Sequence, residues 1–123
     1  MRDSAVTQKM CGIEWVVEAH GCDPAALADL TKLQALFEAL TGELSLHPVG
    51  DPNWHQFDGG GITGLRLLSE SHVACHTFPE FGSLCLNVFC CQPRPDADFD
   101  KLLRLHVQAG MVHVRRIERP YRR

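Results

Sequence analysis

Hydrophobic residues along the chain follow two kinds of pattern: short apolar runs that predict strands, and apolar residues repeated every three or four positions that predict helices. The strand-like runs are short, rich in β-branched and aromatic residues, and bounded by glycine, proline or polar turns. Pro79 ends the run of residues 72–78, and Asp51–Asn53 is predicted to be a turn after residues 43–49. The predicted strands are residues 12–19, 43–49, 63–71, 72–78, 83–90 and 111–118.

Two helices are predicted where apolar residues recur three or four positions apart. The first begins with Asp23 as its N-cap and Pro24 at its first position, and it ends at Gly42. The second covers residues 99–106 and ends at Gly110.

These elements predict an α+β fold, a two-layer sandwich in which two helices cover one face of a mainly antiparallel sheet. The whole chain, residues 1–123, is predicted to be a single domain. Alternation is poor in residues 84–89, which predicts burial on both sides of that strand. A second copy of the chain would cover the other face, so we expect a homodimer that packs through its sheets.

Composition is that of an ordinary globular protein, with 45% hydrophobic and 22% charged residues. The net charge of −3 gives no electrostatic reason to expect a nucleic-acid partner. No apolar run reaches the length of a membrane span, so no membrane association is expected. Arginines gather near the C-terminus and are predicted to lie on a solvated strand edge and tail: Arg115, Arg116, Arg119, Arg122 and Arg123.

The cysteines show no C-x-x-C spacing, and no apolar leader precedes them, so a reduced, cytoplasmic protein is expected. Cys91 is singled out because it ends an apolar run just before a turn, where a thiol can donate a proton. No role is predicted for its neighbour Cys90. The remaining cysteines are predicted to be packing residues: Cys11, Cys22, Cys75 and Cys85.

Ser71 is the candidate reactive residue. It follows Glu70, with His76 five positions and Cys91 twenty positions further on. A Glu-Ser peptide bond, a histidine and a cysteine are the parts needed to make and use a pyruvoyl group. Strict strand alternation separates Ser71 from His76, so a bend or bulge near Glu70 is predicted to bring them together. The alternative is an ordinary serine at a strand end.

A metal site is not predicted. His72 and His76 are four residues apart, which on a helix would let them share one ion. On a strand the same spacing is about 13 Å, too far for one zinc ion.

The residues around Ser71 also resemble a known family. Gly61–Gly64, Ser69–His72 and His76–Glu80, together with Cys91, are similar to the prokaryotic S-adenosylmethionine decarboxylase proenzymes. These are the pyruvoyl-dependent enzymes of spermidine synthesis. The resemblance extends from about residue 12 to residue 118.

The resemblance implies that the chain cleaves itself. The Ser71 hydroxyl would attack the carbonyl of Glu70 to form an ester, and elimination would leave a pyruvoyl group at the former Ser71. The products would be a β chain of residues 1–70 and an α chain of residues 71–123. By analogy His76 removes the α-proton, and Thr63, where the family usually has serine, hydrogen-bonds the processing intermediate.

The resemblance also implies the chemistry of turnover. The pyruvoyl group from Ser71 would form a Schiff base with the substrate amine, so no external cofactor is expected. Cys91 would then protonate the carbon that loses carbon dioxide. Phe57 and Phe78 would sandwich adenine, and Glu80 would bind the ribose hydroxyls. Without the resemblance, the two phenylalanines are equally well explained as core residues.

Two other functions remain open. Relatives of the same architecture decarboxylate ornithine or arginine, and Asp58 would then bind the distal cation of the substrate. The chain would otherwise be an unprocessed, non-catalytic partner subunit. Asp58 begins a glycine-rich loop, residues 58–61, in which the backbone can approach a ligand closely or simply turn.

Overall fold

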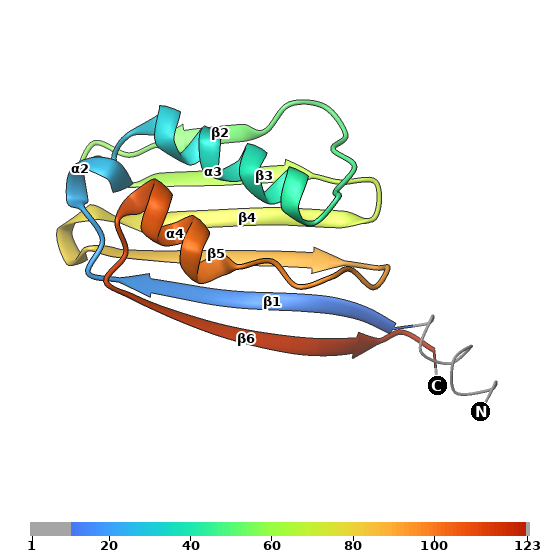
Figure 1. Cartoon of the computed structure of the whole chain (residues 1–123). Helices are drawn as coiled ribbons and strands as arrows, with labels where there is room; N and C mark the ends of the chain where they lie inside the picture. The colour runs from blue at the N-terminus through green and yellow to red at the C-terminus, as the bar shows by residue number, and fades with distance from the viewer. Residues whose placement is uncertain (1–10, 123) are drawn as a thin grey trace.

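The computed structural model describes residues 11–122 and is built on one antiparallel sheet (Figure 1). Its strands lie in the order β2-β3-β4-β5-β1-β6, and each neighbouring pair is antiparallel. The strands are β1 (Cys11–His20), β2 (Asn53–Gln56), β3 (Ile62–Leu67), β4 (Ser71–Phe78), β5 (Ser83–Cys90) and β6 (Met111–Pro120).

The helices lie on one side of this sheet (Figure 1). They are α2 (Pro24–Leu27), α3 (Leu30–Glu43) and α4 (Phe99–Val107), and a 3-10 turn, η1 (Pro79–Phe81), joins β4 to β5. Each helix begins at an aspartate whose side chain accepts a hydrogen bond from a backbone N–H of the first turn. The predicted N-cap at Asp23, with Pro24 after it, is confirmed. No helix within residues 11–122 combines the length and the hydrophobicity of a membrane span.

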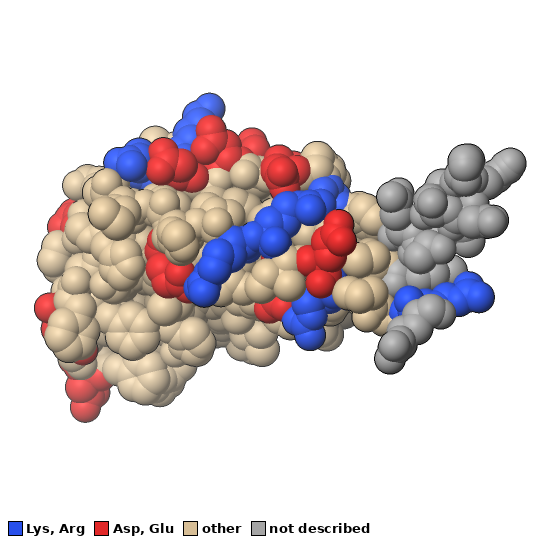
Figure 2. All heavy atoms as spheres, turned by 90° about the horizontal axis from the view of Figure 1, so that it is seen from below, with Lys and Arg blue, Asp and Glu red and all other residues tan. Residues whose placement is uncertain are grey.

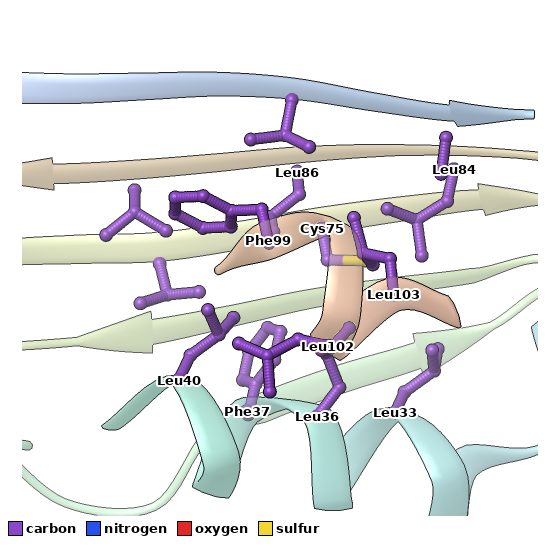
Figure 3. Packing of buried hydrophobic residues seen from close by; sticks show 14 of the residues in the cluster. Leu33, Leu36, Phe37, Leu40, Cys75, Leu84, Leu86, Phe99, Leu102 and Leu103 are labelled. Atoms are coloured by element: carbon purple, nitrogen blue, oxygen red, sulfur yellow. The ribbon is translucent and has the colours of Figure 1, made fainter. Parts of the chain in front are cut away.

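The core lies between the helices and the sheet (Figure 3). Leu36 and Phe37 of α3 and Leu103 of α4 are at most 1% exposed, and they belong to one hydrophobic cluster with Cys75 and Leu86 of the strands. Removing this apolar surface from water is the main stabilising term of the fold. The predicted two-layer α+β sandwich is confirmed.

The other side of the sheet, called the open face below, is not covered by any helix of residues 11–122. Alternation along β4 shows the two sides clearly. Val73 and Cys75 are buried beneath the helices, whereas His76 is exposed on the opposite side. Leu65 and Leu67 of β3, 46% and 58% exposed, add apolar surface to the open face.

The first predicted helix is divided in two. The chain leaves helical geometry at Ala28, and Asp29 caps a new helix by accepting a hydrogen bond from the N–H of Thr31 at 3.0 Å. The prediction that Gly42 ends this helix is wrong: α3 continues to Glu43, and Gly42 does not adopt a left-handed conformation. Ser45, with φ of 52°, makes the reversal instead.

The strand predicted for residues 43–49 is wrong. Leu44 closes α3, and only Pro48 of this segment makes an isolated bridge, to Leu68. The edge strand is β2, which begins at Asn53, within the predicted turn. Packing of Trp54 explains why this segment is a strand, since its ring lies on Phe37 with centroids 4.6 Å apart. This tertiary contact outweighs the weak local preference of residues 53–56 for a strand.

Arg115, Arg116 and Arg119 lie on β6, at the edge of the sheet, as predicted, and Arg122 follows the end of this strand. Figure 2 shows basic and acidic side chains side by side along this edge. Arg115 pairs with Glu18 at 2.6 Å and Arg116 with Asp96 at 3.2 Å. The arginines of β6 therefore meet carboxylates of the same chain. Arg123 lies outside the described residues.

Gly64→Ala is expected to destabilise the fold, because a Cβ atom there would lie 2.3 Å from Cζ3 of Trp54. We expect a loss of about 1–3 kcal/mol in the free energy of unfolding, measured by urea denaturation. Gly42→Ala is the control. It meets no atom within 4 Å and lies in the last turn of α3, so it should gain up to about 1 kcal/mol. Undiminished stability of Gly64→Ala would contradict this account of β2.

Candidate functional site

Glu70, Ser71 and Cys91 meet at the start of β4, and we call them the cleavage cluster. The Ser71 hydroxyl donates a hydrogen bond to the carbonyl oxygen of Glu70, the residue before it. The backbone N–H of Cys91 donates to the same oxygen at 3.2 Å. The Cys91 thiol lies 3.5 Å from the Ser71 hydroxyl oxygen. A nucleophile, the carbonyl it can attack and a donor to that carbonyl are therefore together.

Strand pairing builds this cluster. Ser71 is the first residue of β4 and pairs with Cys90, the last residue of β5, so Cys91 follows directly beside Glu70. The connection from β3 is tight, because Leu68 and Ser71 exchange backbone hydrogen bonds of 2.9 and 3.3 Å. The sheet thus holds the Glu70–Ser71 peptide at a sharp turn.

The Glu70 carboxylate has its own set of partners, and the sequence predicted none of them. Its Oε2 atom contacts Nδ1 of His47 at 3.1 Å and accepts a hydrogen bond from Ser69 at 2.5 Å, while Oε1 lies 3.4 Å from Nη2 of Arg94. The hydrogen bond from Ser69 is the main cause of a lowered pKa for Glu70, and the charges of His47 and Arg94 add to it. The only sequence feature that could have drawn attention to the contact between Arg94 and Glu70 is the position of this arginine between two prolines, Pro93 and Pro95.

The two adjacent cysteines have different environments. The Cys90 side chain is 1% exposed in the core, and burial raises its pKa to about 11. Cys90 is thus a packing residue that stays protonated. Cys91 is half-buried and lies at the Ser71 hydroxyl, so strand alternation assigns one thiol to the core and the other to the cluster.

A second feature, here called the aromatic pocket, lies at the far end of β4. It is a cavity of about 610 Å³, a usual size for a small-molecule site. Five of the residues predicted from the sequence line it together. The lining residues are Phe57, Gly59, Gly61, Thr63, His76, Thr77, Phe78 and Glu80.

Thr63 and His76 form the polar wall of the aromatic pocket. They are register partners of β3 and β4, and the Thr63 hydroxyl lies 3.1 Å from Nδ1 of His76. Their side chains point to the open face, because the neighbouring positions Ile62 and Cys75 are buried beneath the helices. This hydrogen bond fixes the imidazole while leaving its other nitrogen available for proton transfer.

The two phenylalanines of the pocket are not core residues. Phe57 is 55% exposed and Phe78 is 40% exposed. His55 packs edge-on against Phe57, with ring centroids 4.5 Å apart. Exposed rings around a cavity are available to contact a flat ligand.

Gly61 lets the glycine-rich loop close one side of the pocket. A Cβ atom at this position would lie 2.9 Å from the backbone oxygen of Thr77, so only glycine fits. The Thr77 hydroxyl is buried and ties the neighbouring elements together. It accepts a hydrogen bond from the N–H of Ile62 at 2.9 Å and donates to the carbonyl of Leu27 at 2.8 Å.

The chain bends at Ser69 and Glu70, but the prediction that a bend or bulge there brings Ser71 to His76 is wrong. β4 pairs with β5 without interruption from Ser71 to Phe78, and β3 pairs with the same strand from Thr63 to Leu67. Five extended residues span about 16 Å, so within one chain the cleavage cluster and His76 are well apart. The structure thus contains two separate groups of the predicted residues, one at each end of β4.

Two further predictions concern cysteines and metals. Cys85 was expected to be buried but is exposed, because β5 places it on the open face beside His76. Cys22 and Cys75 are buried, as predicted. Within residues 11–122, no three histidine, cysteine or acidic side chains lie close enough to hold a metal ion.

Known proteins resemble this chain over nearly its whole length. A family model described as S-adenosylmethionine decarboxylase matches residues 13–120. The S-adenosylmethionine decarboxylase proenzyme of Pyrococcus furiosus is 33% identical over 112 residues, which cover 88% of this chain and 78% of that protein. The proenzyme of Moorella thermoacetica is 31% identical over 105 residues, covering 85% and 83%.

A solved structure has the same fold. The crystal structure of the adenosylmethionine decarboxylase from Aquifex aeolicus superposes with a TM-score of 0.75 at 21% identity, covering 94% of this chain and 95% of that one. The family model spans both ends of β4, where the cleavage cluster and the aromatic pocket lie. The chain belongs to the S-adenosylmethionine decarboxylase family.

Proposed function

We propose that the chain cleaves itself between Glu70 and Ser71 and then decarboxylates S-adenosylmethionine, giving the aminopropyl donor for spermidine synthesis. The observation that carries the proposal is the cleavage cluster, in which the Ser71 hydroxyl and the Cys91 N–H both contact the Glu70 carbonyl oxygen. Family membership supports the substrate, since the relatives are named for S-adenosylmethionine.

Cleavage follows from the chemistry of a serine next to a polarised carbonyl. The Ser71 oxygen attacks the carbonyl carbon of Glu70, and the peptide C–N bond breaks. The hydroxyl proton passes to the released nitrogen, which becomes a free amine on Ser71, and an ester now joins the two residues. During the attack, negative charge grows on the Glu70 oxygen. The Cys91 N–H, 3.2 Å from that oxygen, is placed to stabilise it.

The ester then breaks by elimination. A base removes the α-proton of Ser71, the Cβ–Oγ bond breaks, and Glu70 departs as a carboxylate that keeps the former serine oxygen. Water hydrolyses the remaining dehydroalanine, ammonia leaves, and the α chain of residues 71–123 begins with a pyruvoyl group. The β chain ends at Glu70.

His76 is the proposed base, and it requires a second copy of the chain. The open face carries apolar side chains such as Leu65 and Leu67, which a partner sheet would cover. A two-fold axis between the sheets and perpendicular to β4 reverses that strand in the partner. The His76 and Thr63 of one chain then face the cleavage cluster of the other, so each site of the homodimer takes residues from both chains.

The residues of both groups fit a pyruvoyl group formed from Ser71. When formed, it supplies an electrophilic carbonyl for the substrate amine and an electron sink as carbon dioxide leaves. Cys91 holds a proton on its sulfur 3.5 Å from the Ser71 oxygen and delivers it to the substrate carbon. In the dimer, Thr63 orients His76 through their 3.1 Å hydrogen bond.

The aromatic pocket favours a nucleoside substrate over an amino acid with a distal cation. Phe57 and Phe78 present exposed rings for adenine and for the sulfonium group, and Glu80 supplies acceptors for the ribose hydroxyls. Asp58, which would bind the distal cation of ornithine or arginine, is exposed and is not among the described residues that line the pocket.

Ser71→Ala should remain whole on a denaturing gel and be inactive, because it lacks the attacking oxygen. Cys91→Ala should be cut into two fragments, because its backbone N–H is kept. Its decarboxylation should fall by about 10²–10⁴-fold through loss of the proton donor. Cys90→Ala is the matched control and should retain activity once folded. Cleavage of Ser71→Ala would contradict the assignment, and an uncut wild-type chain would indicate the non-catalytic partner subunit instead.

Carbon dioxide release should be measured with S-adenosylmethionine, ornithine and arginine side by side. We expect turnover of S-adenosylmethionine alone, with a raised KM in Phe57→Ala and Phe78→Ala, because each variant removes one ring from the pocket. Asp58→Asn is the control and should leave KM unchanged, as its carboxylate does not line the pocket. Faster release from ornithine or arginine would overturn the nucleoside assignment.

A further inference from the structure

Arg94 has an unused hydrogen-bond donor beside the proposed cleavage point. Its side chain is 16% exposed, and its Nη2 atom lies 3.4 Å from Oε1 of Glu70, a long contact. The Nε atom is fully buried and has no hydrogen-bond partner among residues 11–122. A buried, charged donor without an acceptor is unfavourable, and such groups mark strained or functional positions.

The Glu70 side chain does not explain this arginine. Its carboxylate already has closer partners in Ser69, at 2.5 Å, and His47, at 3.1 Å. Arg94 therefore adds positive charge to a carboxylate that two other groups hold. The buried Nε–H of Arg94, beside the same residue, still has no acceptor among residues 11–122.

Self-cleavage creates such an acceptor on the same residue. Before cleavage the Glu70 carbonyl is neutral, and afterwards it is a carboxylate with a full negative charge. The loop that follows β5 already touches this group, because the N–H of Cys91 donates to the Glu70 carbonyl oxygen at 3.2 Å. Arg94 lies three residues further along the same loop, with its guanidinium next to Glu70.

We propose that Arg94 stabilises the new α-carboxylate of Glu70 and so promotes the second step of processing, the elimination that breaks the ester. This inference rests on the proposed self-cleavage. In that step the Cβ–Oγ bond of Ser71 breaks, its electron pair goes to the departing carboxylate of Glu70, and the α-proton goes to the base. An arginine N–H directed at the departing oxygens lowers the energy of the charge that develops there.

Arg66 offers a matched comparison within the chain. Its side chain is 10% exposed, pairs with Glu38 at 2.8 Å, and likewise has a buried Nε atom without a partner in the described part of the chain. Arg66 lies on β3 beneath the helices, and its side-chain hydrogen bonds go to Glu38 and Thr41 of α3 rather than to Glu70. Loss of a buried arginine in general is therefore separable from loss of Arg94.

The test follows newly synthesised chains from cell-free translation, before processing is complete. Arg94→Gln should convert to fragments about 10²-fold more slowly than wild type, the lower end of the range for loss of a charge-stabilising donor. The ester should accumulate, so hydroxylamine should cut the whole Arg94→Gln chain rapidly between residues 70 and 71. Arg94→Lys keeps the charge and should recover part of the rate, and Arg66→Gln should process like wild type.

Three results would overturn the inference. Arg94→Gln processing at the wild-type rate would show that the guanidinium is not needed. A slow Arg94→Gln chain that resists hydroxylamine would place the defect before the ester. An equal delay in Arg66→Gln would indicate a general effect of losing a buried arginine. In each case a wild-type chain that is cut leaves the proposed self-cleavage standing, whereas an uncut wild-type chain removes both.

Discussion

The backbone register of β3, β4 and β5 is the constraint on which the site depends. It places Ser71 opposite Cys90, and it places Thr63 opposite His76 at the other end of the same strand. Because side chains alternate along a strand, a slip of one residue would turn Cys91 and His76 to the wrong sides of the sheet. The helices enforce this register, since only one alternation buries Val73 and Cys75 beneath them.

The same register separates the candidate site residues into two groups. The cleavage cluster contains the Ser71 hydroxyl, the Glu70 carbonyl and the Cys91 thiol, whereas the aromatic pocket contains the His76 imidazole and the phenylalanine rings. Each part is fully built within one chain, but the two lie about 16 Å apart. If two chains stacked their open faces with β4 running in opposite directions, the cleavage cluster of one chain would meet the aromatic pocket of the other. The uncovered side of the sheet would then be needed for function.

Much of this structure was predictable from the pattern of residues, and the failures have physical causes. Runs rich in β-branched and apolar residues between turn residues predicted β1 and β5, and Asp23 with Pro24 marked the first helix. The prediction of a strand at residues 43–49 was wrong because α3 continues through Gly42 to Glu43. A glycine can occupy a helical position, so its presence does not by itself end a helix.

Contacts between distant segments were beyond sequence reasoning. The residues of the aromatic pocket were identified by family resemblance, and the structure brings them together. Resemblance did not reveal that Ser71 and His76 lie apart, because a motif gives order along the chain and not strand register. Arg94 and His47 were missed because only folding brings them to Glu70.

The most direct test of this account combines two inactive chains. Ser71→Ala and His76→Ala chains, carrying different affinity tags, would be co-expressed, and mixed dimers isolated through both tags. If sites are shared, the intact His76 of the first chain should act on the Ser71 of the second. The His76→Ala chain should then be cut only in mixed dimers, while Ser71→Ala stays whole. A His76→Ala chain that remains whole in isolated mixed dimers would contradict the account.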